Sequence, residues 1–203
     1  MTNDEDKELL FRDDLHQFLL SVDMIDERLP EAPDLEELWQ PIAQSYMPDA
    51  IREFNGEYPR VAFGWIMYVG MALAKYWDVE WTTYSKVTDL YAYLRDRIDF
   101  DHMDDYICEK VLCLDAKEHE VVNNVVGECA ARTYNKLCRM RLEAGSKEAF
   151  RTFVAALHQM YLMGIAVELR SLGYHIPQFG ITECLIQYKC SVNTPPPHAI
   201  RSG

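Results

Sequence analysis

The chain has 203 residues, with 49% hydrophobic and 26% charged side chains, which is enough to bury a sizeable core without disulfides or metals. Its formal net charge is −13, and residues 1–60 alone hold sixteen acidic and five basic side chains. We therefore expect no binding to DNA or RNA, because a nucleic-acid binder needs Lys and Arg to neutralise phosphates. The acidic stretch predicts a solvated helix face or, as the sharper alternative, a surface that docks to a basic partner.

The N-terminus, Met1-Thr-Asn-Asp-Glu-Asp, is acidic and lacks the apolar stretch of a signal peptide. None of the six cysteines forms a Cys-x-x-Cys pair, and their wider spacings do not match a zinc knuckle. Four of them fall on apolar stripes of predicted helices, where a free thiol packs as a small hydrophobic group. We therefore expect reduced thiols and a cytoplasmic, intracellular protein.

The first predicted helix begins at Thr2 and Glu5, which have the spacing of a capping box, and it ends before Pro30 and Pro33. Apolar residues recur along it at alternating spacings of four and three. These residues are Phe11, Leu15, Phe18, Val22 and Ile25. The spacing predicts one apolar stripe that faces a core.

Prolines punctuate the next segment. A second helix is expected from Asp34, and Pro41 should kink or split it because proline removes a backbone donor. Pro48 is expected to begin a further short helix, which Asn55-Gly56 closes.

Residues 61–74 carry no charged side chain and form the most apolar run in the chain. A membrane-spanning helix needs about 20 such residues, whereas a run of about 10–14 is typical of a buried core helix. Arg60 and Lys75 bracket the run and keep it short. The sequence therefore predicts a central helix over residues 61–76 and no membrane span.

The segment 80–98 is predicted as one amphipathic helix, and a short helix follows over 103–112. The apolar stripe of the first consists of Tyr84, Val87, Tyr91, Leu94 and Ile98. Both segments are expected to pack against the central helix.

Two long helices complete the pattern. Asp115 and Glu118 give a start signal for the first, with Gly145 as its natural stop. Ser146 is expected to cap the second, whose inward face begins at Phe150.

These elements predict an all-α fold, a bundle of about six to eight helices around the apolar helix at 61–76. Residues 1–193 are expected to form a single domain, and residues 194–203 a mobile, irregular tail. The segment 181–190 fits either a helix or a strand.

The densest polar cluster is the candidate metal site. Asp99, Asp101, His102 and Asp105 offer oxygen and nitrogen ligands of the kind that divalent cations bind. The alternative is structural, because the cluster lies between two predicted helices, where Asp is favoured as a cap and turn residue.

Four further residues are candidates for binding. Trp65, Tyr68 and Lys75 lie on the predicted central helix and would line an adjacent pocket, while His158 lies beside the inward stripe of the last helix. No nucleophile elbow, phosphate-binding loop, dinucleotide fingerprint or zinc-protease motif occurs, so no catalytic residue and no cofactor is predicted.

Two hypotheses for function follow. The leading one is a non-catalytic helical module that binds a second copy of itself or another protein, since the chain holds twelve Tyr, four Trp and nine Met, types favoured at interfaces. The alternative is a small helical enzyme or ligand-binding protein with a pocket between helices, assisted by a metal in the Asp99–Asp105 cluster.

Overall fold

The computed structural model of the chain describes residues 4–54, 59–97 and 99–174. Within these ranges the fold is all-α and contains no strand, as the sequence predicts. The helices are α1 (Asp4–Ser21), α2 (Pro33–Glu36), α3 (Trp39–Arg52), α4 (Arg60–Tyr84), α5 (Leu90–Arg95), α6 (Met103–Tyr106) continued by a π-helical turn at Ile107–Val111, α7 (Ala116–Arg139) and α8 (Lys147–Ser171).

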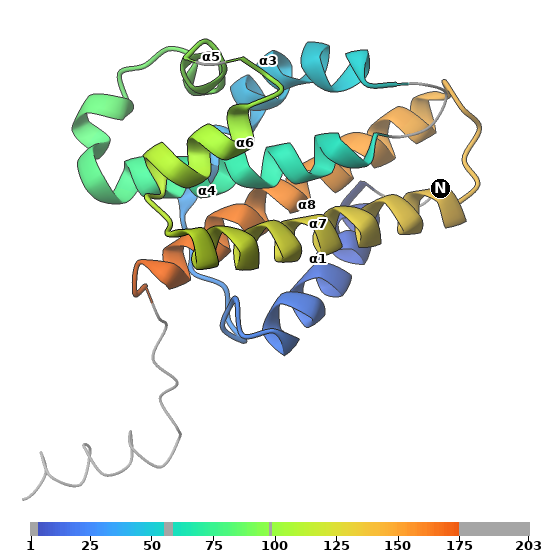
Figure 1. Ribbon diagram of the computed structural model, residues 1–203. Coiled ribbons are helices and arrows are strands. Elements are labelled where there is room, and N and C mark those ends of the chain that lie inside the picture. The colour runs from blue at the N-terminus through green and yellow to red at the C-terminus, as the bar shows by residue number, and fades with distance from the viewer. Residues whose placement is uncertain (1–3, 55–58, 98, 175–203) are drawn as a thin grey trace, which may run out of the picture.

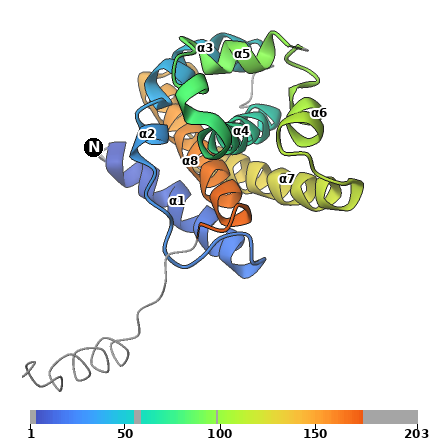
Figure 2. The same cartoon turned by 90° about the vertical axis from the view of Figure 1, so that its left-hand side faces the viewer.

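Two long helices, α4 and α8, run through the middle of the molecule and contact each other most extensively. In Figure 1 α3 and α5 lie above this pair, and α7 and α1 lie below it. The end-on view in Figure 2 places α1 and α2 on one side of the pair and α6 and α7 on the other. The bundle is therefore built around two core helices.

The predicted central helix is confirmed as the middle of α4. From Ala62 to Ala74 every side chain except that of Trp65 is buried, because helices cover α4 on several sides. An element that is apolar all round is stable only when it is surrounded in this way.

The backbones of α4 and α8 meet at a pair of glycines. A Cβ atom on Gly70 would lie 2.2 Å from the carbonyl oxygen of Tyr161, and one on Gly164 would lie 2.1 Å from that of Met67. Both distances are far inside van der Waals contact, so each helix offers a glycine where the other backbone passes. The two core helices thus approach more closely than side chains would allow.

The second core helix, α8, is buried on almost all sides. By length and composition it is the one helix among the described residues that could cross a membrane, yet most of its apolar window lies inside the fold. Core helices of this kind are usual where neighbours cover every face. The sequence pattern predicted its start but not its central place.

The predicted break between the helices of residues 34–54 is displaced. The chain splits before Trp39, and Pro41 lies in the first turn of α3, where no helical donor is lost. The prediction that Pro48 begins a new helix is wrong, because α3 continues through Pro48 to Arg52.

The predicted continuous helix over 80–98 is also wrong. α4 extends through a distorted residue, Glu80 (φ −160°, ψ 63°), to Tyr84, and α5 begins only at Leu90. Asp89 interrupts the helix, since its carboxylate accepts a hydrogen bond from the Ala92 amide at 2.9 Å and so caps α5. The short helix predicted over 103–112 is present as α6 and its π-helical turn.

The caps of the last two helices are confirmed. Asp115 and Glu118 form a reciprocal capping box at the start of α7, and Ser146 Oγ accepts from the Ala149 amide at 3.0 Å. Gly145 does not end α7, which stops at Arg139, but lies in the following turn with a φ of +76°.

Two residues that were predicted to face the core are exposed: Val22 and Phe150. Val22 lies just past the end of α1, so it no longer follows the helical stripe. Several sequence predictions lie outside the described residues, namely the Thr2 cap, the 181–190 segment and the 194–203 tail.

Gly70→Ala is expected to lower the free energy of unfolding by about 2–4 kcal/mol, because the new methyl group forces the α4 and α8 backbones apart. Thermal and urea unfolding measure the change. Gly127→Ala is the matched control: a Cβ there meets nothing within 4 Å, so removing a helical glycine should stabilise the protein by about 0.5–1 kcal/mol. Equal stability changes in the two variants would contradict the close crossing.

Candidate functional site

The binding candidates on α4 do not share one pocket. The ring of Trp65 packs edge-on against Phe100, with 4.2 Å between ring centroids. The Tyr68 hydroxyl donates a hydrogen bond to Asn123 Oδ1 on α7, and Lys75 Nζ lies 3.9 Å from Glu168 Oε1 on α8. Each side chain therefore serves a different contact between helices.

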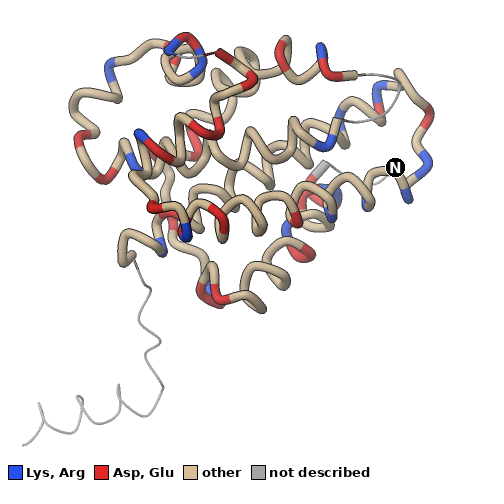
Figure 3. The backbone as a smooth tube through the Cα atoms, viewed as in Figure 1, with Lys and Arg blue, Asp and Glu red and all other residues tan. Residues whose placement is uncertain are grey.

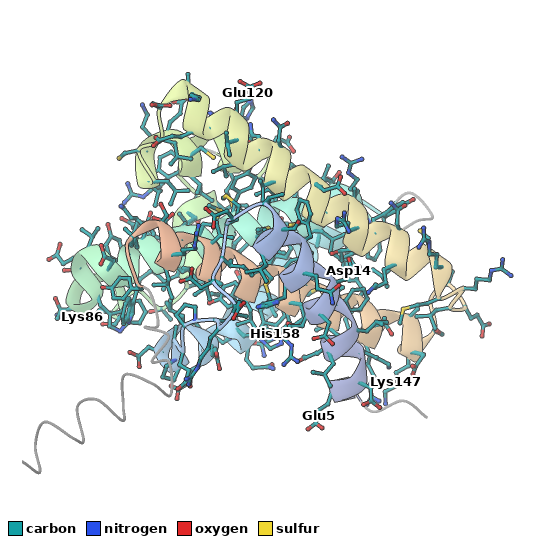
Figure 4. All side chains as sticks on the ribbon, turned by 90° about the horizontal axis from the view of Figure 1, so that it is seen from below. Glu5, Asp14, Lys86, Glu120, Lys147 and His158 are labelled. Carbon is teal, nitrogen blue, oxygen red and sulfur yellow. The ribbon has the colours of Figure 1, made fainter. Side chains whose placement is uncertain are left out.

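His158 is also engaged in the fold. Its imidazole stacks on Trp39, with centroids 4.7 Å apart, and Nδ1 donates to Glu8 Oε1 at 3.0 Å. Figure 4 shows it beside α1, where α1 packs on α8. The contacts join α8 to α1 and α3, which is the role of a structural histidine.

The residues of the predicted metal site lie at the surface, and only Asp99 among them closes a turn. Asp99 Oδ1 accepts from the His102 backbone amide at 3.0 Å and from its ring Nδ1 at 2.9 Å. This pairing lowers the pKa of the Asp99 carboxyl and raises that of His102. Asp101 lines an open cleft, and Asp105 lies 3.9 Å from His119 instead. In the part of the chain that the structure describes, no three His, Cys, Asp or Glu side chains are arranged to hold a metal ion.

The buried thiols are poorly suited to nucleophilic catalysis. Burial raises the pKa of Cys108 and of Cys129 to about 12, so neither thiol ionises near neutral pH. Cys108 lies beside the Tyr68 hydroxyl, whose pKa burial also raises.

Sequence reasoning missed a buried ion cluster around Asp49. This carboxylate is 5% exposed and accepts hydrogen bonds from Tyr91 at 2.6 Å, from Arg95 at 3.2 Å and from Arg52. Burial, followed by the bond to Asp49, raises the pKa of Tyr91 and keeps it a donor. No sequence signal predicted the cluster, because Tyr91 and Arg95 lie some forty positions further along the chain.

An open polar cleft of about 780 Å³ lies over this cluster, between the end of α3 and the α5–α6 connection. Its lining consists of Asp49, Arg52, Glu53, Arg95, Asp96, Asp99, Phe100 and Asp101. Both arginines are committed to Asp49, and Arg95 also bonds Asp96 at 2.9 Å. The carboxylates of the cleft therefore neutralise the two arginines and hold them in place.

A second hollow has a different character. A groove of about 810 Å³ lies at the end of the bundle where α7 turns into α8, next to the end of α3. We call it the α7–α8 groove. It is lined by Phe54, Leu137, Cys138, Arg141, Leu142, Ala144, Gly145, Ser146, Lys147, Ala149, Phe150 and Phe153.

Two phenylalanines of the α7–α8 groove remain open to solvent. Phe150 is 50% exposed and Phe54 is 36% exposed. Beneath them Phe153 is fully buried, and its ring meets Phe54 edge-on at 5.2 Å and Phe63 of α4 at 5.3 Å. The groove thus has a rigid floor that belongs to the core, and its wall presents apolar surface to solvent.

The chain around the groove is basic, although the protein is acidic. Residues 132–151 hold six Lys or Arg and two Glu, whereas the rest of the chain holds fourteen basic and thirty-one acidic residues. Arg141 and Lys147 line the groove itself. Figure 3 shows blue segments around the α7–α8 turn. An apolar groove with a basic rim suits an apolar helix face flanked by acidic side chains.

No protein-family model, curated protein or solved structure matches this chain.

The buried carboxyl group of Glu168 is expected to make the stability of the protein depend on pH. Burial raises the pKa of its carboxyl to about 7, and Lys75 opposes the shift only weakly across 3.9 Å. A raised carboxyl pKa favours the protonated folded state, so the stability gained at low pH is lost as the pH rises through about 7. Glu168→Gln should therefore stabilise the protein by about 1–3 kcal/mol at a pH of about 8.5 and much less at about 5.

Thermal melts of wild type and Glu168→Gln across that pH range measure this effect. Glu143→Gln, which removes an exposed carboxylate, is the control and should melt like wild type throughout. A Glu168→Gln effect that is the same at both ends of the range would contradict the prediction.

Proposed function

We propose that the protein is a non-catalytic helical module that acts by binding another protein chain in the α7–α8 groove. The observation that carries the proposal is the exposed apolar wall of this groove, formed by Phe54 and Phe150, above a buried aromatic floor. Exposed aromatic surface next to a well-packed floor is typical of binding sites whose occupant covers it.

The chemistry of the groove supports binding rather than catalysis. Among the described residues its lining contains no acid–base pair, and its basic side chains Arg141 and Lys147 stand at an apolar surface. Such a lining recognises shape and charge. The occupant is expected to be an amphipathic helix with leucine-like side chains on one face and carboxylates beside them.

The free thiols of Cys108, Cys113, Cys129 and Cys138 suit the cytoplasmic setting that the sequence predicts. The polar cleft over Asp49 gives less support to the alternative, an enzyme or ligand-binding protein, because its arginines already have carboxylate partners.

The proposal is tested with a designed helical peptide that carries leucines on one face and glutamates beside them. On titration, methyl and aromatic NMR signals of Leu137, Leu142 and Phe153 should shift, because these residues line the groove. The same peptide with lysines in place of glutamates should bind at least about tenfold more weakly, and salt should reduce the difference.

Phe150→Ser should weaken binding of the acidic peptide at least about tenfold, since it removes exposed apolar surface without opening the core. Val79→Ser is the matched control, because Val79 is 64% exposed on α4 and lies outside the groove lining. Signal shifts elsewhere on the protein, or unchanged affinity in Phe150→Ser, would contradict the proposal.

A further inference from the structure

The surface of the chain contains a helix face that matches the α7–α8 groove. Helix α1 has six acidic and two basic residues. It also carries two leucines at its surface, Leu9 and Leu10, which are both 41% exposed. The buried stripe of α1 is formed instead by Phe11, Leu15 and Leu19. Its leucine pair therefore belongs to an outer face that no other helix of the described residues covers.

The charges on this outer face complement those around the groove. Asp13 lies one turn from Leu9 and Leu10 and is 64% exposed, and Arg12 beside it forms an ion pair with its carboxylate at 3.2 Å. α1 carries a balance of −4, and residues 132–151 carry +4. The outer face of α1 thus shows the pattern that the groove requires, apolar side chains beside carboxylates.

The fold already uses this complementarity within one chain. Lys136 of α7 donates to the Leu10 carbonyl oxygen at 2.8 Å and lies 3.7 Å from Asp14. A second ion pair, of the opposite polarity, joins Lys7 of α1 to Glu148 of α8 at 2.6 Å. α1 is thereby fixed against both helices that form the groove, with its leucine pair turned away from the core.

These contacts place helix α1 next to the groove. Lys136 precedes the groove residue Leu137, and Glu148 lies between the groove residues Lys147 and Ala149. Figure 4 shows Glu5 and Lys147 at the same end of the molecule. A two-fold symmetric dimer needs a surface and its complement close together, so that two copies can exchange both contacts at once.

We propose that the α7–α8 groove of one copy binds the outer face of α1 from a second copy, and that the second copy does the same in return. Leu9 and Leu10 of one protomer cover Phe150 and Phe54 of its partner, and the carboxylates beside them meet the basic rim. Because both contacts form at once, the dimer buries two copies of this apolar surface, and a stable dimer requires a large buried area. The inference rests on the proposed function, because it names the occupant of the same groove.

Sedimentation of the full chain over a range of concentrations tests the proposal. Wild type should dimerise, and raised salt should weaken the dimer, since opposite charges meet at its rim. Phe150→Ser and Leu9→Ser should each raise the dimer dissociation constant at least about tenfold, whereas Val79→Ser should leave it unchanged. All three replace exposed side chains, so thermal melts should confirm that each variant is folded.

Mixing the two interface variants tests the geometry. Phe150→Ser supplies an intact α1 and Leu9→Ser an intact groove, so the mixture should form a heterodimer that keeps one of the two contacts. Its dissociation constant should lie between that of wild type and those of the separate variants. A dimer that persists in both variants, or a mixture that associates no better than its components, would overturn the proposed interface.

Two different results would separate the failure of the proposed dimer from the failure of the proposed function of the groove. A wild-type chain that stays monomeric at all concentrations, while the acidic peptide binds it and not Phe150→Ser, removes self-association and leaves the groove a site for another protein. Absence of both dimer and peptide binding removes both proposals.

Discussion

The close crossing of α4 and α8 at Gly70 and Gly164 is the constraint on which the rest of the structure depends. Each glycine admits the backbone of the other helix, so the two core helices pack closely and bury almost every side chain from Ala62 to Ala74 of α4 and most of those of α8. The other helices then have a continuous apolar surface to cover. The covering helices leave a groove near the start of α8, and Phe153, just beyond the first turn of that helix, forms its floor. The candidate site is thus a consequence of how the core pair terminates.

Charge decides how the covering helices are placed. α1 is acidic and lies against the basic stretch of α7 and α8, where Lys136 pairs with Asp14 of α1. A further pair of the opposite polarity joins Lys7 of α1 to Glu148 of α8. A partly exposed ion pair such as Lys136–Asp14 contributes little stability by itself, about 0–1 kcal/mol, but it favours one of the orientations that apolar contacts leave equal. Only part of the basic stretch is used in this way, and Arg141 and Lys147 stand at the groove. The same complementarity is therefore available to a second acidic helix.

Local rules predicted the parts of the fold that depend on neighbouring residues. The Asp115 capping box, the Ser146 cap and the apolar run of α4 each form within a few turns of chain. The break at Asp89 was missed because the apolar period continues across it, although a cap competes locally with the helix.

The groove and the Asp49 cluster depend on contacts between distant segments. Phe150 fits the inward stripe of α8, and only the end of the bundle leaves it exposed. Asp49 is a buried acceptor because Tyr91 and Arg95 fold onto it. The aspartates of residues 99–105 match metal ligands in type, yet Asp99 closes a turn by accepting from the His102 amide, as their alternative interpretation predicted. The spacing of residues along the chain cannot distinguish a buried phenylalanine from an exposed one, or a metal ligand from a turn residue.

Native-state hydrogen exchange tests the central claim, that the crossed pair of α4 and α8 is the stable unit around which the other helices assemble. Amides near Gly70 and Gly164 should exchange only through global unfolding, with the free energy and denaturant dependence of the whole molecule. Amides of α1 and α5 should exchange earlier, through local openings that leave the pair intact. Exchange of the α4 and α8 amides by a local opening, while α7 stays protected, would contradict the claim.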